Sequence, residues 1–181
     1  MSPGTIDPTL IASLCADHKR IRAVLLPLIS NEINTLAYHY GDADPELARV
    51  VSELDTLCVD LEVHFTEEEL FVLPLLEKLI KNGDLGDHDL STLDQQVSQM
   101  QSRHEDFATL AAELRGHVGE LRLPATAASL HAAVLDNLRE LLAVLCHSDH
   151  VEQNRLFPSA LACIRYHINV HRAQRAHGGV S

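Results

Sequence analysis

The stretch that decides the fold reads His64-Phe-Thr-Glu-Glu68-Glu-Leu-Phe-Val-Leu-Pro74. In it a histidine and a glutamate stand four residues apart inside an apolar pattern with helical spacing. Followed one turn at a time, the same stripe carries Leu75, Phe71, Glu68, His64, Leu61, Leu57 and Leu54. Because a buried histidine or glutamate is costly without a partner, the stripe predicts a core helix whose polar pair meets groups from elsewhere in the chain.

Length and composition predict one all-α domain. The chain has 181 residues, 46% hydrophobic residues, 4% aromatic residues and no Trp, which favours helices over a β-sandwich. The formal net charge of −12 argues against nucleic-acid binding, which needs a basic face. Charges interrupt every apolar run well before about 20 residues, so no membrane span is expected.

The N-terminus and the cysteines predict a cytoplasmic protein. Residues 1–8 contain neither a basic segment nor an apolar segment of the kind found in export signals. The four cysteines, which lack the CxxC spacing, are Cys15, Cys58, Cys146 and Cys163. They occur at positions typical of a helical core, so we expect packed, reduced thiols.

Four long amphipathic helices are expected, at about residues 8–38, 45–81, 91–115 and 125–168. Asp7-Pro8 and Asp44-Pro45 are start signals, and Pro74 and Pro158 predict kinks. Short connections between such helices predict an up-down-up-down four-helix bundle over residues 1–171, with a disordered tail at 172–181. Its oligomeric state, monomer or homodimer, stays open.

Further polar residues occur on the expected inward faces of the other helices, namely His18, His104 and Glu152. At about 1.5 Å per residue, His18 lies about 33 Å and His64 about 29 Å from the turn near residue 40, so the two are level. A weak internal repeat aligns Pro74 with Pro158 and thereby Glu68 with Glu152. We therefore expect these side chains to meet in the bundle core.

Several imidazoles and two carboxylates in one core are typical ligands for a pair of iron ions. Zinc accepts the same donors, but the absence of thiolates and the number of ligands favour iron. No organised nucleophile–base pair and no Gly-rich phosphate loop occurs, so no catalytic side chain is assigned and a hydrolase or kinase is not expected.

The chain resembles the hemerythrin-like (HHE cation-binding) family, whose pattern is a His, a His-x-x-x-Glu, a His and a second His-x-x-x-Glu. The matching residues are His18, His64 with Glu68, His104, and Glu152. Within the family it is most similar to the iron–sulfur cluster repair (RIC) group, through segments over about residues 17–161. These are Asp17-His-Lys-Arg-Ile-Arg, Leu-Leu-Pro27-Leu-Ile, His39-Tyr-Gly-Asp, Arg103-His104 and Glu152-Gln-Asn-Arg-Leu-Phe-Pro158.

The chain departs from the family pattern in its second half, where Ser148 occupies the position of the last histidine. An extra residue in that turn, a π-bulge, would bring His147 towards Glu152, and we predict His147 as a ligand. The alternatives are His150, Asp149 or an open position at Ser148. His39 also matches a family histidine but lies about 31 Å along the helix from His18, so it is left out of the ligand set.

The resemblance implies two non-haem iron ions, bridged by carboxylates and an oxo group, that handle nitric oxide, oxygen or peroxide. It also implies a role in the nitrosative or oxidative stress response or in iron–sulfur cluster repair, with damaged iron–sulfur proteins as partners. Nitric oxide reduction or peroxide decomposition would make the protein an oxidoreductase. The alternative is a non-enzymatic protein that binds or senses oxygen.

Overall fold

The computed structural model describes residues 6–82 and 85–178, except for the side chains of residues 82, 101–106 and 176–178. It confirms the all-α class, since the described residues include no strand. The α-helices are α1 (Pro8–Arg20), α2 (Leu26–Tyr40), α3 (Glu46–Glu67), α4 (Leu73–Asn82), α5 (Asp87–Glu120), α6 (Ala128–Val151) and α7 (Phe157–Gly178). Short helical turns are η1 (Ile21–Leu25), η2 (Glu68–Val72), η3 (Ala125–Ala127) and η4 (Glu152–Leu156).

The chain forms two compact units, each with its own apolar core. The first comprises residues 1–15, 66–103 and 149–181, and the second comprises residues 16–65 and 104–148. We call them the carboxylate unit and the histidine unit, after the candidate ligands that each contains. The prediction of a single domain over residues 1–171 is not tested by this division and stays a prediction.

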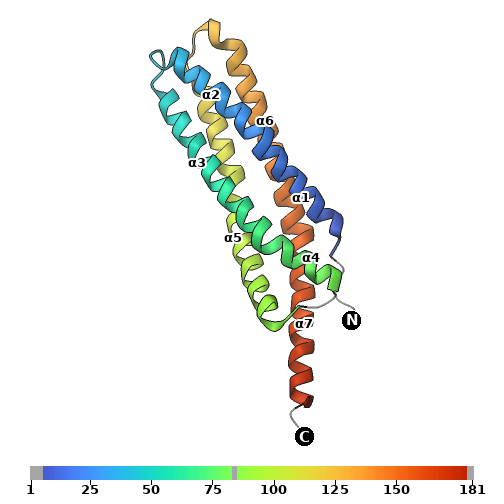
Figure 1. The fold of residues 1–181 in the computed structure, drawn as a ribbon. Helices are drawn as coiled ribbons and strands as arrows, with labels where there is room; N and C mark the ends of the chain where they lie inside the picture. The colour runs from blue at the N-terminus through green and yellow to red at the C-terminus, as the bar shows by residue number, and fades with distance from the viewer. Residues whose placement is uncertain (1–5, 83–84, 179–181) are drawn as a thin grey trace. The chain divides into compact units, whose positions relative to one another are not determined.

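The histidine unit is built from α2, α3, the second half of α5 and α6, which lie side by side (Figure 1). Its core joins leucines, isoleucines and valines of all four segments, including Ile29, Leu57, Leu114 and Leu138. Asp44 closes one end, because its carboxylate accepts hydrogen bonds from the backbone N–H of Glu46 (3.0 Å) and of Arg122 (2.7 Å). One buried acid thus caps α3 and holds the connection that follows α5.

The carboxylate unit contains the start of α1, the run from η2 through the first half of α5, and the run from η4 through α7. Asp7 caps α1 by accepting the Thr9 backbone N–H at 2.9 Å, as the sequence predicted. At the start of α5, Asp87 contacts two side chains of α7, through a hydrogen bond with the His171 ring at 2.7 Å and an ion pair with Arg175. These contacts attach the C-terminal helix to the first turn of α5.

The part of the chain that the structure describes contains three π-helical turns, each ending two residues before a proline. The turns are η1 before Pro27, η2 before Pro74 and η4 before Pro158. In η2 the backbone N–H of Leu73 donates to the carbonyl of Glu68, five residues earlier. Proline cannot donate, and its ring clashes with the carbonyl four residues back, so a widened turn relieves the clash. The sequence predicted kinks at Pro74 and Pro158; the structure has π turns there, and a third before Pro27.

The π turn explains why two predicted core positions were wrong. The regular spacing placed Phe71 and Leu75 on the buried stripe after Glu68. In the structure Phe71 is 51% exposed and Leu75 is half-buried, while Val72 and Leu76 are fully buried. A π turn takes more residues than an α turn, so the buried face falls one residue later than a regular helix predicts.

Other differences concern ends and thiols. Helix α5 begins at Asp87 rather than Ser91, because Leu90 is already packed in the core. Helix α7 continues to Gly178, past the predicted end at Ile168. All four cysteines are free, but Cys15 and Cys146 are exposed, so the prediction of packed thiols was wrong for these two.

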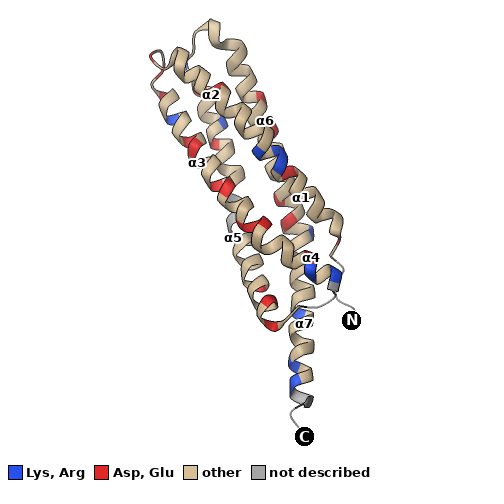
Figure 2. Ribbon diagram, viewed as in Figure 1, with Lys and Arg blue, Asp and Glu red and all other residues tan. Residues whose placement is uncertain are grey.

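None of the described helices is long and apolar enough to cross a membrane. Acidic residues are spread along α3 (Figure 2), in keeping with the net charge of −12.

Candidate metal centre

Two predicted ligands, His18 and His64, are buried in the histidine unit. His18 is in the last turn of α1 and is 0% exposed, and His64 is near the end of α3 and is 3% exposed. Both have an aromatic neighbour, Phe65, whose ring stacks on His18 with centroids 4.1 Å apart and an interplanar angle of 20°. Buried imidazoles are expensive to protonate, so this surrounding favours the neutral form that binds metals.

Aromatic and cationic groups fix the surroundings of these imidazoles. The ring of Phe107, on α5, lies 5.0 Å from that of His64. The guanidinium of Arg22 lies 5.3 Å from the centroid of Phe65 and pairs with Glu62 at 2.9 Å. No local pattern in the sequence identifies Phe65 as a residue that supports His18, because the stacked rings belong to two different helices, α1 and α3.

Two more predicted ligands, Glu68 and Glu152, are buried together in the carboxylate unit. Their exposed fractions are 0% and 1%, and carboxylate oxygens of the two residues lie within 4.8 Å of each other. Each glutamate is the first residue of a π turn, η2 or η4. The structure therefore supports the internal repeat, because each acid begins a π turn and precedes its proline by six residues.

Two buried carboxylates this close repel each other when both are ionised, and a bound cation removes that repulsion. Carboxylate oxygens with imidazole nitrogens form a donor set that suits iron, and zinc accepts it as well. The residues present therefore fit a metal centre. Partial desolvation raises the pKa of the Cys15 thiol, and the carboxylates of Glu69 and Glu68 raise it further, which disfavours the thiolate form that binds metals.

The other histidines considered as ligands are either exposed or have side chains outside the described residues. His104 lies on α5, but its side chain is outside the described residues. His147 is exposed on α6, and the π turn begins at Glu152 instead of preceding it. His150 is exposed next to Asn154, and His39 is exposed near the end of α2. The ligand role predicted for His147 therefore gains no support from its position and stays a prediction.

Ser148 occupies the inward position that the family pattern gives to a histidine. It is buried, and its hydroxyl donates to the carboxylate of Asp17 at 3.4 Å, a long hydrogen bond between α6 and α1. Asp17 directly precedes His18 in the chain. The sequence pattern marks Ser148 as a possible open position but gives no sign of its contact with Asp17.

The hemerythrin HHE cation binding domain matches residues 9–160 of the chain. The chain belongs to the hemerythrin HHE cation-binding family. A probable iron–sulfur cluster repair protein of Haemophilus influenzae is 25% identical to the chain over 144 residues, which cover 80% of this chain. The match spans only 60% of that relative's length. No solved structure matches the chain significantly.

Proposed function

We propose that this HHE protein binds two non-haem iron ions through His18, His64, Glu68 and Glu152, with His104 as a further ligand. The observation that carries the proposal is the buried pair Glu68 and Glu152, whose carboxylate oxygens lie within 4.8 Å of each other. Carboxylates can bridge two metal ions a few ångströms apart, while neutral imidazoles complete the coordination. The iron pair would supply the one-electron and small-ligand chemistry typical of non-haem iron.

The residues of this chain would set what the iron can do. Glu68 and Glu152 would hold the metals by charge, and His18, kept in one orientation by Phe65, would contribute a neutral nitrogen. Ser148 offers a hydroxyl where an imidazole would otherwise be, which leaves room for an exchangeable ligand. We infer that the ligand is nitric oxide, oxygen or peroxide, within a nitrosative or oxidative stress response.

A role in iron–sulfur cluster repair is the finer form of this proposal. It rests on the likeness to the Haemophilus influenzae protein and on the segments shared with the repair group. Because the match spans 60% of that relative, the repair activity and any partner among damaged iron–sulfur proteins belong to the proposal. Reactivation of an oxidised iron–sulfur enzyme by the iron-loaded protein, but not by the metal-free protein, would support it.

Metal analysis tests the central proposal. The purified protein should bind two iron ions per chain and show an oxo-to-iron absorption in the near ultraviolet after exposure to air. Glu68→Gln should lose most of the iron, whereas Glu77→Gln, an exposed acid on α4, should keep it. Zinc in place of iron, or equal iron in both variants, would contradict the proposal.

The alternative function, reversible oxygen binding, requires a fuller set of imidazoles. His147 would have to supply one of them, so His147→Ala discriminates between the two functions. Since His147 is exposed, we expect the variant to retain its iron and its reaction with nitric oxide or peroxide. Loss of iron from His147→Ala, together with reversible absorbance changes on adding and removing oxygen, would favour the oxygen binder.

A further inference from the structure

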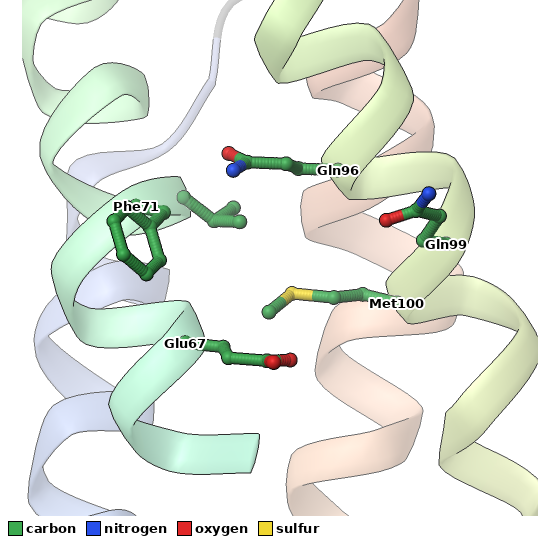
Figure 3. A pocket seen from close by; sticks show the side chains of 6 residues that line it. Glu67, Phe71, Gln96, Gln99 and Met100 are labelled. Carbon is green, nitrogen blue, oxygen red and sulfur yellow. The ribbon is translucent and has the colours of Figure 1, made fainter. Parts of the chain in front are cut away.

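A small pocket in the carboxylate unit lies between η2 and α5 (Figure 3). It has a volume of about 190 Å³ and is lined by Glu67, Phe71, Val72, Gln96, Gln99 and Met100. Phe71 and Gln99 are exposed while Val72 and Met100 are buried, so the pocket leads from the surface into the unit. Drug-sized ligands need about 300 Å³ or more, so the pocket suits a molecule of only a few heavy atoms.

Residues that line the pocket are close in sequence to two predicted iron ligands, Glu68 and His104. Glu67 directly precedes Glu68, and Val72 is the last residue of the π turn that Glu68 starts. On the opposite wall, Met100 precedes His104 by four residues, one turn along α5. Each wall of the pocket thus has one residue, Glu67 or Met100, within about one turn along the chain of a predicted ligand.

One polar atom in the pocket requires a hydrogen-bond donor. The side-chain oxygen Oε1 of Gln96 is buried and accepts no hydrogen bond from any residue that the structure describes. The amide of Gln96 points towards the space between η2 and α5, where the thioether of Met100 also points (Figure 3). A buried carbonyl oxygen without a donor is costly, so a ligand with an O–H group would be held here.

This requirement separates the ligands that the proposed function leaves open. Nitric oxide, oxygen, nitrite and superoxide have no O–H or N–H group to donate to this oxygen. Hydrogen peroxide is neutral, small, and both donates and accepts hydrogen bonds. We propose that the pocket is a binding and access site for hydrogen peroxide, an inference that rests on the proposed iron centre for its purpose.

Access of peroxide to the pocket can be tested without iron, through Met100. Met1 and Met100 are the two methionines of the chain, so labelling methionine methyl groups with carbon-13 gives a separate signal for Met100. Peroxide in the pocket would transfer one oxygen to the thioether sulfur; the O–O bond breaks, a sulfoxide forms and water leaves. We expect steady oxidation of Met100 in the folded, metal-free protein, although its side chain is only 5% exposed.

Gln96→Leu and Gln95→Leu form a matched pair of variants, because Gln95 is exposed and does not line the pocket. Loss of one hydrogen bond should slow Met100 oxidation about fivefold in Gln96→Leu and leave it unchanged in Gln95→Leu. A Met100 that resists peroxide in the folded wild-type protein, or equal rates in the two variants, would overturn the pocket assignment.

The iron-loaded protein provides the second arm of the test. Gln96→Leu should slow the reaction of the centre with hydrogen peroxide by a similar factor of about five and leave the reaction with nitric oxide unchanged. If the protein holds no iron, the proposed function fails while the Met100 result still decides the pocket. If the loaded wild type and Gln96→Leu react equally fast with peroxide, the pocket fails while the iron centre stands.

Discussion

Phe65 connects the packing of the histidine unit to the candidate ligands. It is 2% exposed, stacks on His18 and lies 5.7 Å from the ring of His64. Replacing it with leucine removes the stacked face and leaves a small void. We expect Phe65→Leu to lower the free energy of unfolding by about 1–3 kcal/mol and to weaken iron binding, because the His18 ring can then rotate.

Iron titration and urea unfolding of the same samples measure both effects. Leu57→Ala is the control, since Leu57 is buried on the same helix without an aromatic contact to a histidine among those described. It should cost about 2–5 kcal/mol of stability with little change in iron affinity. If the affinity falls with stability alone, whichever side chain is changed, Phe65 has no positioning role.

Asp44 is expected to make the stability of the histidine unit depend on pH, with lower stability in acid. The backbone N–H of Arg122, and then that of Glu46, lower the pKa of its carboxyl below the ordinary value of 3.8. A carboxyl whose folded pKa is lowered stabilises the fold above the unfolded pKa, and this contribution is lost as pH falls through the folded pKa. Asp44→Asn should therefore lower the urea midpoint near neutral pH. The difference from wild type should shrink at pH values below 3.8.

The exposed neighbour Asp42 provides the comparison for this experiment, since it lies in the same connection. Asp42→Asn should leave the urea midpoint nearly unchanged at every pH. A constant difference between wild type and Asp44→Asn across the acid range would show that the charge of Asp44 is not what stabilises the connection.

The site residues show what the sequence could and could not predict at this scale. Regular helical spacing was enough to place His18, His64, Glu68 and Glu152 on buried faces, and all four are buried. His147 was different, because its predicted inward position depended on an irregular turn. Such a turn depends on packing against other helices, and here it formed after Glu152 rather than before it.

At the scale of the element, each of the two carboxylates begins a π turn, Glu68 in η2 and Glu152 in η4. A π turn amounts to one residue inserted into an α-helix, so removing a residue should restore the regular helix without changing how its two flanks pack. Leu70 is the natural choice, since it lies within η2 and is 63% exposed. We expect deletion of Leu70, combined with Pro74→Ala, to keep the helical content and to abolish iron binding.

Pro74→Ala alone is the control for this deletion, because it restores a backbone donor but keeps every residue of η2. It should retain iron. Circular dichroism follows the helical content, and iron per chain follows the site. Full iron binding by the shortened protein would mean that the π turn has no part in placing Glu68.

The positions of the prolines in the sequence mark where the helices are irregular. They indicated that the helix is disturbed, and a kink is the usual result in a regular helix. The common offset of six residues from Glu68 to Pro74 and from Glu152 to Pro158 is visible in the sequence, and so is the third proline, Pro27. The choice between a kink and a π turn depends on tertiary packing, which the spacing alone does not contain.

At the scale of the whole molecule, a bound metal is expected to change the stability of the fold. A metal that binds only the folded state stabilises it by mass action, by about 2.7 kcal/mol when free metal is 100 times the dissociation constant. We expect iron loading to raise the thermal midpoint, and a chelator to lower it again. The midpoint of Glu152→Gln should not respond to iron.

Thermal unfolding followed by circular dichroism, with and without chelator, makes this comparison. A wild-type midpoint that ignores both iron and chelator would contradict the metal centre, whatever the protein's absorption spectrum. The sequence predicted the helical class and the family at this scale, because both follow from patterns repeated over the whole chain. It did not predict that the core divides into two, which depends on how side chains from distant segments pack.

The contacts of His171 and Arg175 with Asp87 give the last turns of α7 a structural importance. A premature stop codon after Val170 would delete both residues and leave the opening turn of α5 without these partners. Loosening there would spread along the same helix towards Gln96 and the peroxide pocket. Proteins made from truncated alleles of this gene, or with a purification tag fused to the C-terminal end, should therefore be treated as altered proteins.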